Sequence, residues 1–318
     1  MIPTPTPTDR DLFAPLRAAA AALPPLPVAV AHPCSEAALQ AVDEAARQGL
    51  IRPILVGPVG RLRVLAASLG VDLDAYRVVD VPHSHAAAEA AVACVRAGEA
   101  EALMKGSLHT DELLAAVVDR ETGLRTERRL SHAFLMDVPA YPKLLMITDA
   151  AINIVPDLEA KRDICQNAID LARALGVQRP KVAILAAVET VNPRMPSTID
   201  AAALCKMADR DQITGGVLDG PLAMDNAISA EAARIKGIRS EVAGDPDVLL
   251  VPDLEAGNIL AKQLTFMAGA DAAGVVLGAR VPIVLTSRAD KVRARLASCA
   301  VAVLLAHARR TALPKVGG

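Results

Sequence analysis

Short apolar runs alternate with longer helix-type segments over most of this 318-residue chain, and this alternation constrains the fold more than any other feature. Residues 28–31, 53–56, 76–79 and 102–104 have the length and apolar content of strands, whereas the Ala-rich segments 35–48 and 85–97 have helical spacing. Strands that alternate with helices are typical of a mostly parallel sheet with helices on its faces. We therefore predict an α/β fold with mostly parallel sheets flanked by helices.

The alternation changes near the middle of the chain. Residues 130–138 and 144–147 both have strand character, and only residues 139–143 separate them. Five residues cannot hold a crossover helix, so this pair near 130–150 should be antiparallel. The alternation then resumes, with helices expected at 225–236 and 258–267, as far as a final helix at about 290–309. We expect two α/β domains, 1–145 with 280–318 and 146–279, with the last segment returning to the first.

Composition excludes several classes of partner. Aromatic residues make up only 2% of the chain and Trp is absent, which argues against a platform on which nucleic-acid bases stack. The 34 basic and 36 acidic residues give a net charge of -2, too little to attract DNA or an anionic membrane. The longest apolar run, 296–306, is shorter than the roughly 20 residues that span a bilayer. The Pro/Thr-rich start makes a poor signal peptide, so we expect a cytoplasmic protein that binds neither nucleic acid nor membrane.

Motifs of several other enzyme classes are missing from the sequence. It has no G-x-x-x-x-G-K-[ST], no G-x-G-x-x-G after a strand and no G-x-S-x-G. These absences argue against NTP hydrolysis, dinucleotide redox chemistry and α/β-hydrolase chemistry. The cysteines form no C-x-x-C pair and the histidines lack metal-ligand spacing, so we expect no metal site.

The richest polar stretch lies where the predicted strand 248–251 leads into a helix. It contains Asp253, Glu255, Gly257 and Asn258. Open α/β sheets bind ligands at the carboxyl ends of their strands, and free N–H groups at a helix start can hold a phosphate or a ribose oxygen. Simple capping by Asp253 and Asn258, with Glu255 in the first turn, remains the alternative.

A second stretch follows the predicted strand 283–285 and contains Thr286, Ser287, Arg288 and Asp290. Arginine binds phosphate with two parallel hydrogen bonds, and hydroxyls can donate to a developing oxyanion. These residues are candidates for a catalytic site. The alternative is an ordinary capping box at the start of the last helix.

Three shorter stretches add candidate binding residues. Lys105 follows a predicted strand and could meet an anion or remain a solvated loop lysine, and Thr110 could cap the next helix. Arg125 precedes the antiparallel pair, with two more arginines close behind, and could bind an anion or belong to a solvated face. Asp149 and Asn153 leave an apolar strand and could be ligands or buried polar pins.

In this order the stretches resemble the phosphate acetyltransferase and phosphate butyryltransferase family. Seven segments carry the resemblance: 104–110, 123–126, 130–132, 148–153, 219–227, 251–259 and 286–288. The most specific of them contains Pro-Asp-Leu-Glu-Ala-Gly-Asn-Ile. The Gly-Leu-Arg-Thr and Met-Lys-Gly forms look closer to the butyryl branch, and to the acyltransferase half of fused hydratase-acyltransferase proteins, than to the acetyl branch.

The resemblance implies a two-domain fold of the isocitrate/isopropylmalate-dehydrogenase type, a homodimer and an active cleft between the domains. It implies no metal and no tightly bound cofactor, with coenzyme A and phosphate as substrates. The thiolate of coenzyme A would attack the carbonyl of an acyl phosphate directly in a ternary complex, or phosphate would attack acyl-CoA in reverse. Ser287 would bond the reacting carbonyl or thiol, and Arg288 and Arg125 would clamp phosphate. The remaining substrate-binding residues expected are Lys105, Thr110, Ser131, Asn153, Asp253, Glu255, Gly257 and Asn258.

One departure from the family pattern concerns the base. The acetyl branch carries an Asp seven residues after the Ser, where this chain has Ala294. The base would then be Asp290, another acid such as Asp253, or none, because a few per cent of a free thiol is already thiolate at neutral pH. A non-catalytic protein that binds acyl-CoA or acyl phosphate on the same fold is the alternative. A related pyridoxine-pathway dehydrogenase would need a metal-binding His set, which the sequence lacks.

Overall fold

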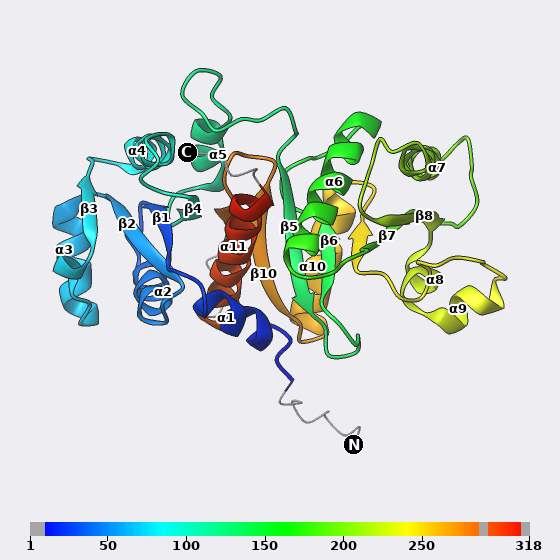
Figure 1. The fold of residues 1–318 in the computed structure, drawn as a ribbon, viewed down its shortest axis with the longest axis horizontal. Coiled ribbons are helices and arrows are strands. Elements are labelled where there is room, and N and C mark those ends of the chain that lie inside the picture. Colours follow the sequence, from blue (N-terminus) through cyan, green and yellow to red (C-terminus); the bar gives the residue numbers. More distant parts are fainter. Residues whose placement is uncertain (1–9, 286–291, 313–318) are drawn as a thin grey trace.

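One sheet of 11 strands runs through the described residues, 10–285 and 292–312, of the computed structural model (Figure 1). From one edge to the other its strands are β3 (Arg77–Asp80), β2 (Ile51–Gly57), β1 (Leu26–Ala31), β4 (Ala102–Lys105), β11 (Ile283–Val284), β10 (Asp271–Leu277), β5 (Ser131–Asp137), β6 (Leu145–Thr148), β9 (Val248–Leu250), β7 (Lys181–Leu185) and β8 (Val217–Leu222).

Most neighbouring strands in this sheet are parallel. β3, β2, β1, β4 and β11 all run in one direction, and β6, β9, β7 and β8 form a second parallel set. Antiparallel pairing is confined to the middle, where β10 pairs with β11 and β5, and β5 pairs with β6. The mostly parallel α/β fold and the antiparallel pair predicted from the short connection 139–143 are therefore confirmed.

Helices cover both faces of the sheet because successive strand side chains point to opposite sides. In β1, Val28 and Val30 join the core under one helix layer, and Ala29 and Ala31 join the core under the other. The first layer holds α1 (Ala14–Ala21), α2 (Glu36–Arg47), α3 (Val59–Leu69), α6 (Leu158–Ala174), α7 (Pro196–Asp209) and α11 (Val292–Ala312). The second holds α4 (Ser84–Arg96), α5 (Thr110–Val118), α8 (Met224–Ile228) and α10 (Leu254–Met267).

The last helix, α11, lies across the middle of the sheet (Figure 1). It packs against α1 and α2 near the start of the chain, against β10, and against α6. The division into two domains stays a prediction. Of the helices in the described ranges, none has the length and apolar character needed to cross a membrane.

Two helix boundaries differ from the sequence-based expectation. Residues 225–236 form two helices, α8 and α9 (Ala230–Ile235), because Ser229 interrupts the first and caps the second through a hydrogen bond from the N–H of Ala232, 3.2 Å long. The helix expected at 258–267 begins at Leu254, because the carboxylate of Asp253 accepts the N–H of Ala256 at 2.8 Å. A side-chain cap thus decides where each helix starts.

Candidate functional site

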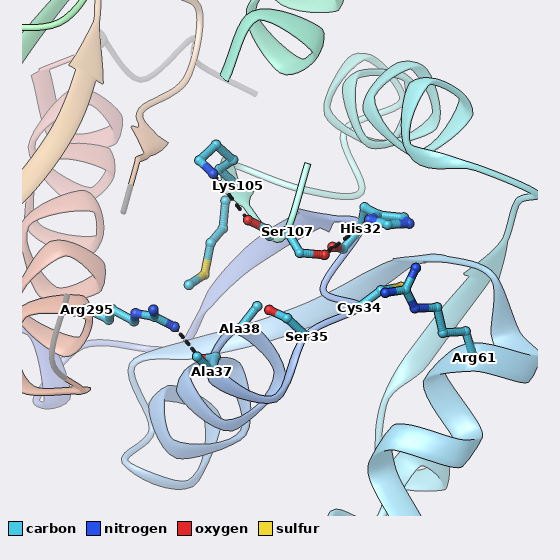
Figure 2. A pocket seen from close by; sticks show the side chains of 11 residues that line it. His32, Cys34, Ser35, Ala37, Ala38, Arg61, Lys105, Ser107 and Arg295 are labelled. Carbon is cyan, nitrogen blue, oxygen red and sulfur yellow. Dashed lines mark hydrogen bonds between the residues drawn. The ribbon is translucent and has the colours of Figure 1, made fainter. Parts of the chain in front are cut away.

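A cavity of about 420 Å³ lies at the carboxyl ends of β1 and β4, and we call it the β1–β4 cavity (Figure 2). Its polar lining comes from the end of β4, from the turns after β1 and β4, and from helices α3 and α11: His32, Ser35, Arg61, Lys105, Ser107 and Arg295. Three of these side chains are cations, and none of the eleven described residues that line the cavity is Asp or Glu. Parallel α/β sheets bind ligands at this edge, and the charge of the lining suits an anion.

Gly106 allows the turns after β1 and β4 to approach each other closely. A Cβ on Gly106 would lie 2.4 Å from the carbonyl oxygen of His32 and 2.5 Å from that of Ala31, so no larger residue fits there without movement of the backbone. This close approach places Ser107 beside His32. The Ser107 hydroxyl donates to the His32 carbonyl oxygen at 2.9 Å and lies 3.2 Å from the His32 Nδ1 (Figure 2).

Two of the cations in the cavity wall are buried. Lys105 is 8% exposed, and its Nζ donates to the carbonyl oxygens of Leu108 at 3.1 Å and Gly106 at 3.3 Å. The alternative of a solvated loop lysine is therefore wrong. Arg295 is 5% exposed and donates from α11 to the carbonyl oxygen of Ala37 in the first turn of α2 (Figure 2). Backbone carbonyls thus hold both cations at the cavity.

Burial sets the protonation of the two titratable groups beside Arg61. Burial lowers the pKa of His32. The charge of Arg61 lowers this pKa further, and the charge of Glu112 opposes the shift. Burial raises the pKa of the Cys34 thiol, against the effect of Arg61. At neutral pH the cavity therefore presents a neutral imidazole and a protonated thiol, and Cys34 is a poor nucleophile.

The structure brings four residues of the predicted polar stretches together at the carboxyl ends of β6 and β9. We call Asp149, Asn153, Gly257 and Asn258 the Asn153 cluster. Asp149 accepts the backbone N–H groups of residues 151, 152 and 153 at 2.9 to 3.1 Å, as well as the Asn153 amide. This carboxylate, 2% exposed, fixes the turn that follows β6.

Helix α10 packs directly on that turn. A Cβ on Gly257 would lie 2.8 Å from Val251 Cγ2, 2.9 Å from the Asp149 carbonyl oxygen and 3.1 Å from Ala150 Cα. The amide of Asn258 donates to the Ala150 carbonyl oxygen at 3.1 Å. Gly257 and Asn258 therefore dock the start of α10 onto the turn, and Gly257 acts by being small.

The side chains of Asp253, Glu255 and Thr110 have simpler surroundings. Asp253 is partly buried and caps α10, as the capping alternative expected. Glu255 is exposed in the first turn of the same helix. Thr110 is the first residue of α5, partly buried, and it does not line the β1–β4 cavity.

The three arginines near the antiparallel pair have different partners. Arg128 pairs with Asp170 on α6. Arg129 donates from Nε to the Asn153 side-chain oxygen at 2.8 Å, which attaches it to the Asn153 cluster. Arg125 is exposed, and within the described ranges its guanidinium forms no ion pair or hydrogen bond. Of the three, Arg125 is the one whose side chain no described residue engages.

Ser131 and its neighbour His132 are buried at the start of β5. Ser131 is fully buried, and its hydroxyl accepts a hydrogen bond from the Asn167 amide at 3.0 Å. His132 is 1% exposed, and its Nδ1 has no hydrogen-bond partner among the residues that the structure describes. Burial lowers the pKa of His132, and the nearby Asp149 opposes this shift. The imidazole is neutral at physiological pH.

Ser287, Arg288 and Asp290, the predicted catalytic residues, lie outside the described residues. The elements on either side of them both adjoin the β1–β4 cavity. β11 pairs with β4, with Val284 opposite the cavity residue Met104, and α11 supplies Arg295.

Sequence reasoning did not single out four of the polar cavity residues: His32, Ser35, Arg61 and Arg295. The first two follow a predicted strand, a position at which polar residues signal a site. Arg61 and Arg295 sit within helices, and no local pattern distinguishes them from other helix arginines.

Residues 82–303 match the family model for phosphate acetyl/butaryl transferase. The chain belongs to this family. It is 66% identical to a phosphate acetyltransferase of Rhizobium meliloti over 297 residues, which cover 93% of this chain and 94% of that protein. It is 43% identical to a phosphate butyryltransferase of Clostridium acetobutylicum over 279 residues, which cover 88% and 93% of the two chains.

A solved family structure has the same fold. The branched-chain phosphotransacylase from Enterococcus faecalis V583 superposes with a TM-score of 0.78 at 32% identity and covers 89% of this chain and 99% of its own. The family prediction is confirmed, and with it the class of acyltransferase enzyme. The motif forms look closer to the butyryl branch, whereas the identity is higher to the acetyltransferase. The identity of the acyl group therefore belongs to the proposal below.

Proposed function

We propose that this protein exchanges an acetyl group between coenzyme A and inorganic phosphate. The observation that carries the choice of acetyl is the 66% identity to a protein named phosphate acetyltransferase, against 43% to one named phosphate butyryltransferase. The cation-lined cavity at the carboxyl ends of β1 and β4 supports a substrate that carries phosphate. Short acyl groups larger than acetyl react more slowly.

The reaction transfers the acyl carbon from oxygen to sulfur. The sulfur of coenzyme A bonds to the carbonyl carbon of acetyl phosphate, the bond between that carbon and the bridging oxygen breaks, and phosphate leaves. The thiol proton passes to a base or to solvent. Both substrates are held in one complex, so the thiol and the carbonyl meet without a diffusive encounter.

Ser287 and Arg288 carry the chemistry in this proposal. The Ser287 hydroxyl donates to the carbonyl oxygen as negative charge develops on it. Arg288 and Arg125 bind the phosphoryl group, and Arg125 suits this role because its guanidinium is exposed and not engaged by a described residue. Residue 294 is an alanine in α11, so the thiol proton goes to Asp290 or leaves without a dedicated base.

The remaining predicted residues hold the site in shape or contact the nucleotide thioester. Lys105 contributes charge at the β1–β4 cavity, and the Asn153 cluster fixes the turn after β6. Ser131, Asp253, Glu255 and Thr110 complete the proposed binding surface. We place the active form in the cytoplasm. We also propose that it is a homodimer, which sedimentation of the purified protein tests.

The test is release of free thiol from acetyl-CoA and from butyryl-CoA, with and without phosphate. The variants are Arg288→Ala and the matched control Arg280→Ala, an exposed arginine at the turn between β10 and β11. We expect phosphate-dependent release that is faster with acetyl-CoA, that collapses in Arg288→Ala and that persists in the control.

Each other outcome has a separate meaning. Faster release from butyryl-CoA contradicts the acetyl assignment and retains the acyltransferase. An unchanged rate in Arg288→Ala removes that residue from the site. No phosphate-dependent release from either thioester, at any pH from 6 to 9, leaves a binding protein on the family's fold.

A further inference from the structure

Another cavity, of about 450 Å³, lies between α6 and α11, and we call it the α6–α11 cavity. These two helices pack against each other on one face of the sheet (Figure 1). The cavity shares no lining residue with the β1–β4 cavity in the part of the chain that the structure describes. We propose that it binds a mononucleotide, or another small molecule in which one phosphoryl group is joined to an apolar ring system.

The first argument is the charge of the cavity wall. Its ionisable side chains are three arginines and one carboxylate, which come from the loop before β5 and from the two helices: Arg128, Asp170, Arg173 and Arg309. Asp170 pairs with Arg128 on the surface, where such a pair contributes little. Among the residues that the structure describes, neither Arg173 nor Arg309 forms an ion pair. Two positive charges are therefore in excess, and the cavity suits an anion.

Arg309 is a partly buried cation with few partners. Its Nη1 donates to the carbonyl oxygens of Ala279 at 3.3 Å and Arg280 at 3.4 Å, and within the described ranges its other two nitrogens have no acceptor. Burial lowers the pKa of Arg309; the charge of Arg128 adds to this effect and that of Asp170 opposes it. The guanidinium still remains protonated, so it can donate further hydrogen bonds to an anion in the cavity.

The number of donors favours a phosphoryl group over a carboxylate. Each guanidinium can donate two parallel hydrogen bonds, and the three arginines come from three separate segments of the chain. A carboxylate offers two oxygens to these forks, whereas the phosphoryl group of a monoester offers three and carries more charge.

The rest of the lining favours an organic ligand. Apolar side chains make up much of it: Leu171, Val177, Leu277 and Leu305. A ring system joined to the phosphoryl group would cover these side chains, and the volume is in the range of small-molecule sites. Arginine also stacks on planar rings.

A buried amide in the wall can bind a sugar hydroxyl. Asn167 lines the cavity and is 4% exposed. Its Nδ2 donates to the Arg129 carbonyl oxygen and to the Ser131 hydroxyl, both at 3.0 Å. Its Oδ1 accepts no hydrogen bond from any residue that the structure describes, which leaves this oxygen for a donor on the ligand. A ribose hydroxyl supplies such a donor.

The α6–α11 cavity is well separated from the β1–β4 cavity. Arg295 and Arg309 lie on the same helix, 14 residues apart, and belong to the two different cavities. At a rise of 1.5 Å per residue the two positions are about 21 Å apart along α11. A mononucleotide between α6 and α11 therefore does not compete with a ligand of the β1–β4 cavity.

The test compares two arginines of the cavity with one that does not line it. The variants are Arg173→Ala, an exposed residue whose replacement should not unfold the protein, and Arg309→Ala. The matched control is Arg310→Ala, the exposed neighbour of Arg309, which pairs with Glu101. Calorimetry measures the binding of AMP, adenosine and ribose 5-phosphate to the full chain, first without and then with excess coenzyme A.

We expect AMP to bind more tightly than adenosine or ribose 5-phosphate, because only AMP has both the ring system and the phosphoryl group. Arg173→Ala and Arg309→Ala should each weaken AMP and ribose 5-phosphate about tenfold, the usual worth of one charge-assisted hydrogen bond, and leave adenosine unchanged. Arg310→Ala should change none of the three affinities. Excess coenzyme A should leave the affinity for AMP unchanged.

Three outcomes would overturn the proposal. The first is a wild type that does not bind AMP, and the second is an equal affinity for AMP in the wild type and all three variants. The third is loss of AMP binding in excess coenzyme A, which would place AMP in the substrate site. If Arg309→Ala does not fold, Arg173→Ala decides alone. Release of thiol from acetyl-CoA tests the proposed function separately, because neither arginine takes part in it.

Discussion

Gly257 tests whether the start of α10 is held by steric contact with the turn after β6. In Gly257→Ala the new Cβ would lie 2.8 Å from a Val251 methyl, 2.9 Å from the Asp149 carbonyl oxygen and 3.1 Å from Ala150 Cα. Two of these three atoms are backbone and cannot rotate away. Alanine gains about 1 kcal/mol over glycine in a helix, and overpacking of a tight site costs about 1–3 kcal/mol.

Because two of the contacts are to backbone atoms, the overpacking cost should lie at about 2–3 kcal/mol, and after the helix gain of about 1 kcal/mol we expect Gly257→Ala to lower the free energy of unfolding by about 1–2 kcal/mol. The matched control is Gly60→Ala in α3, where a Cβ meets no atom within 4 Å. That variant should gain up to about 1 kcal/mol from helix propensity alone. Urea unfolding of both variants and the wild type, followed by circular dichroism, measures the difference.

The order of the three urea midpoints decides the matter. Gly257→Ala should unfold first and Gly60→Ala last. A Gly257→Ala midpoint equal to or above that of the wild type would refute the steric explanation. Gly257 would then be a candidate for contact with a ligand. The hydrogen bond from the Asn258 side-chain amide to the Ala150 carbonyl oxygen should also lengthen in Gly257→Ala. The KM for coenzyme A should therefore rise in Gly257→Ala and not in Gly60→Ala.

Two further outcomes follow from the buried polar groups. Asn153→Ala removes the side-chain hydrogen bonds to Leu130, Asp149 and Arg129, and it should lower the free energy of unfolding, measured with urea, by about 2–3 kcal/mol. A decrease below about 1 kcal/mol would contradict a structural role for these hydrogen bonds. Burial holds the folded-state pKa of His132 below its usual 6.5. The contribution of His132 to the free energy of unfolding is therefore complete above pH 6.5 and is lost as the pH falls. The free energy of unfolding should therefore drop between pH 7.5 and 5.5 more steeply in the wild type than in His132→Asn, and equal slopes would count against it.

The fold was predictable because its signals are local. Strand length, apolar content and the five-residue connection 139–143 each belong to one stretch of chain, and they gave the α/β class and the antiparallel pair. Helix α7 was missed for a related reason. Its N-cap, Met195, makes no capping bond, and its start signal is Pro196 at the first helical position, a residue that equally suits a turn. The break between α8 and α9 depends on the single side chain of Ser229.

The candidate site was predictable only in part, because its polar residues can serve in two ways. Asn153 and Asn258 stood out at strand ends, but only tertiary contacts reveal that Asn153 links residues 129, 130 and 149. Arg295 could not be found from sequence. It lies within an apolar helix and reaches Ala37, 258 residues earlier in the chain. Such a contact leaves no trace in local spacing.

The spacing of the two polar regions bears on which substrate occupies them. The β1–β4 cavity lies at the end of β4, and the Asn153 cluster lies at the end of β6, with β11, β10 and β5 between them. Four steps between strands of about 4.8 Å each separate the two strands by about 19 Å across the sheet. A single phosphate cannot touch both regions, whereas an extended nucleotide thioester can. If both regions bind substrate, coenzyme A is the ligand that joins them.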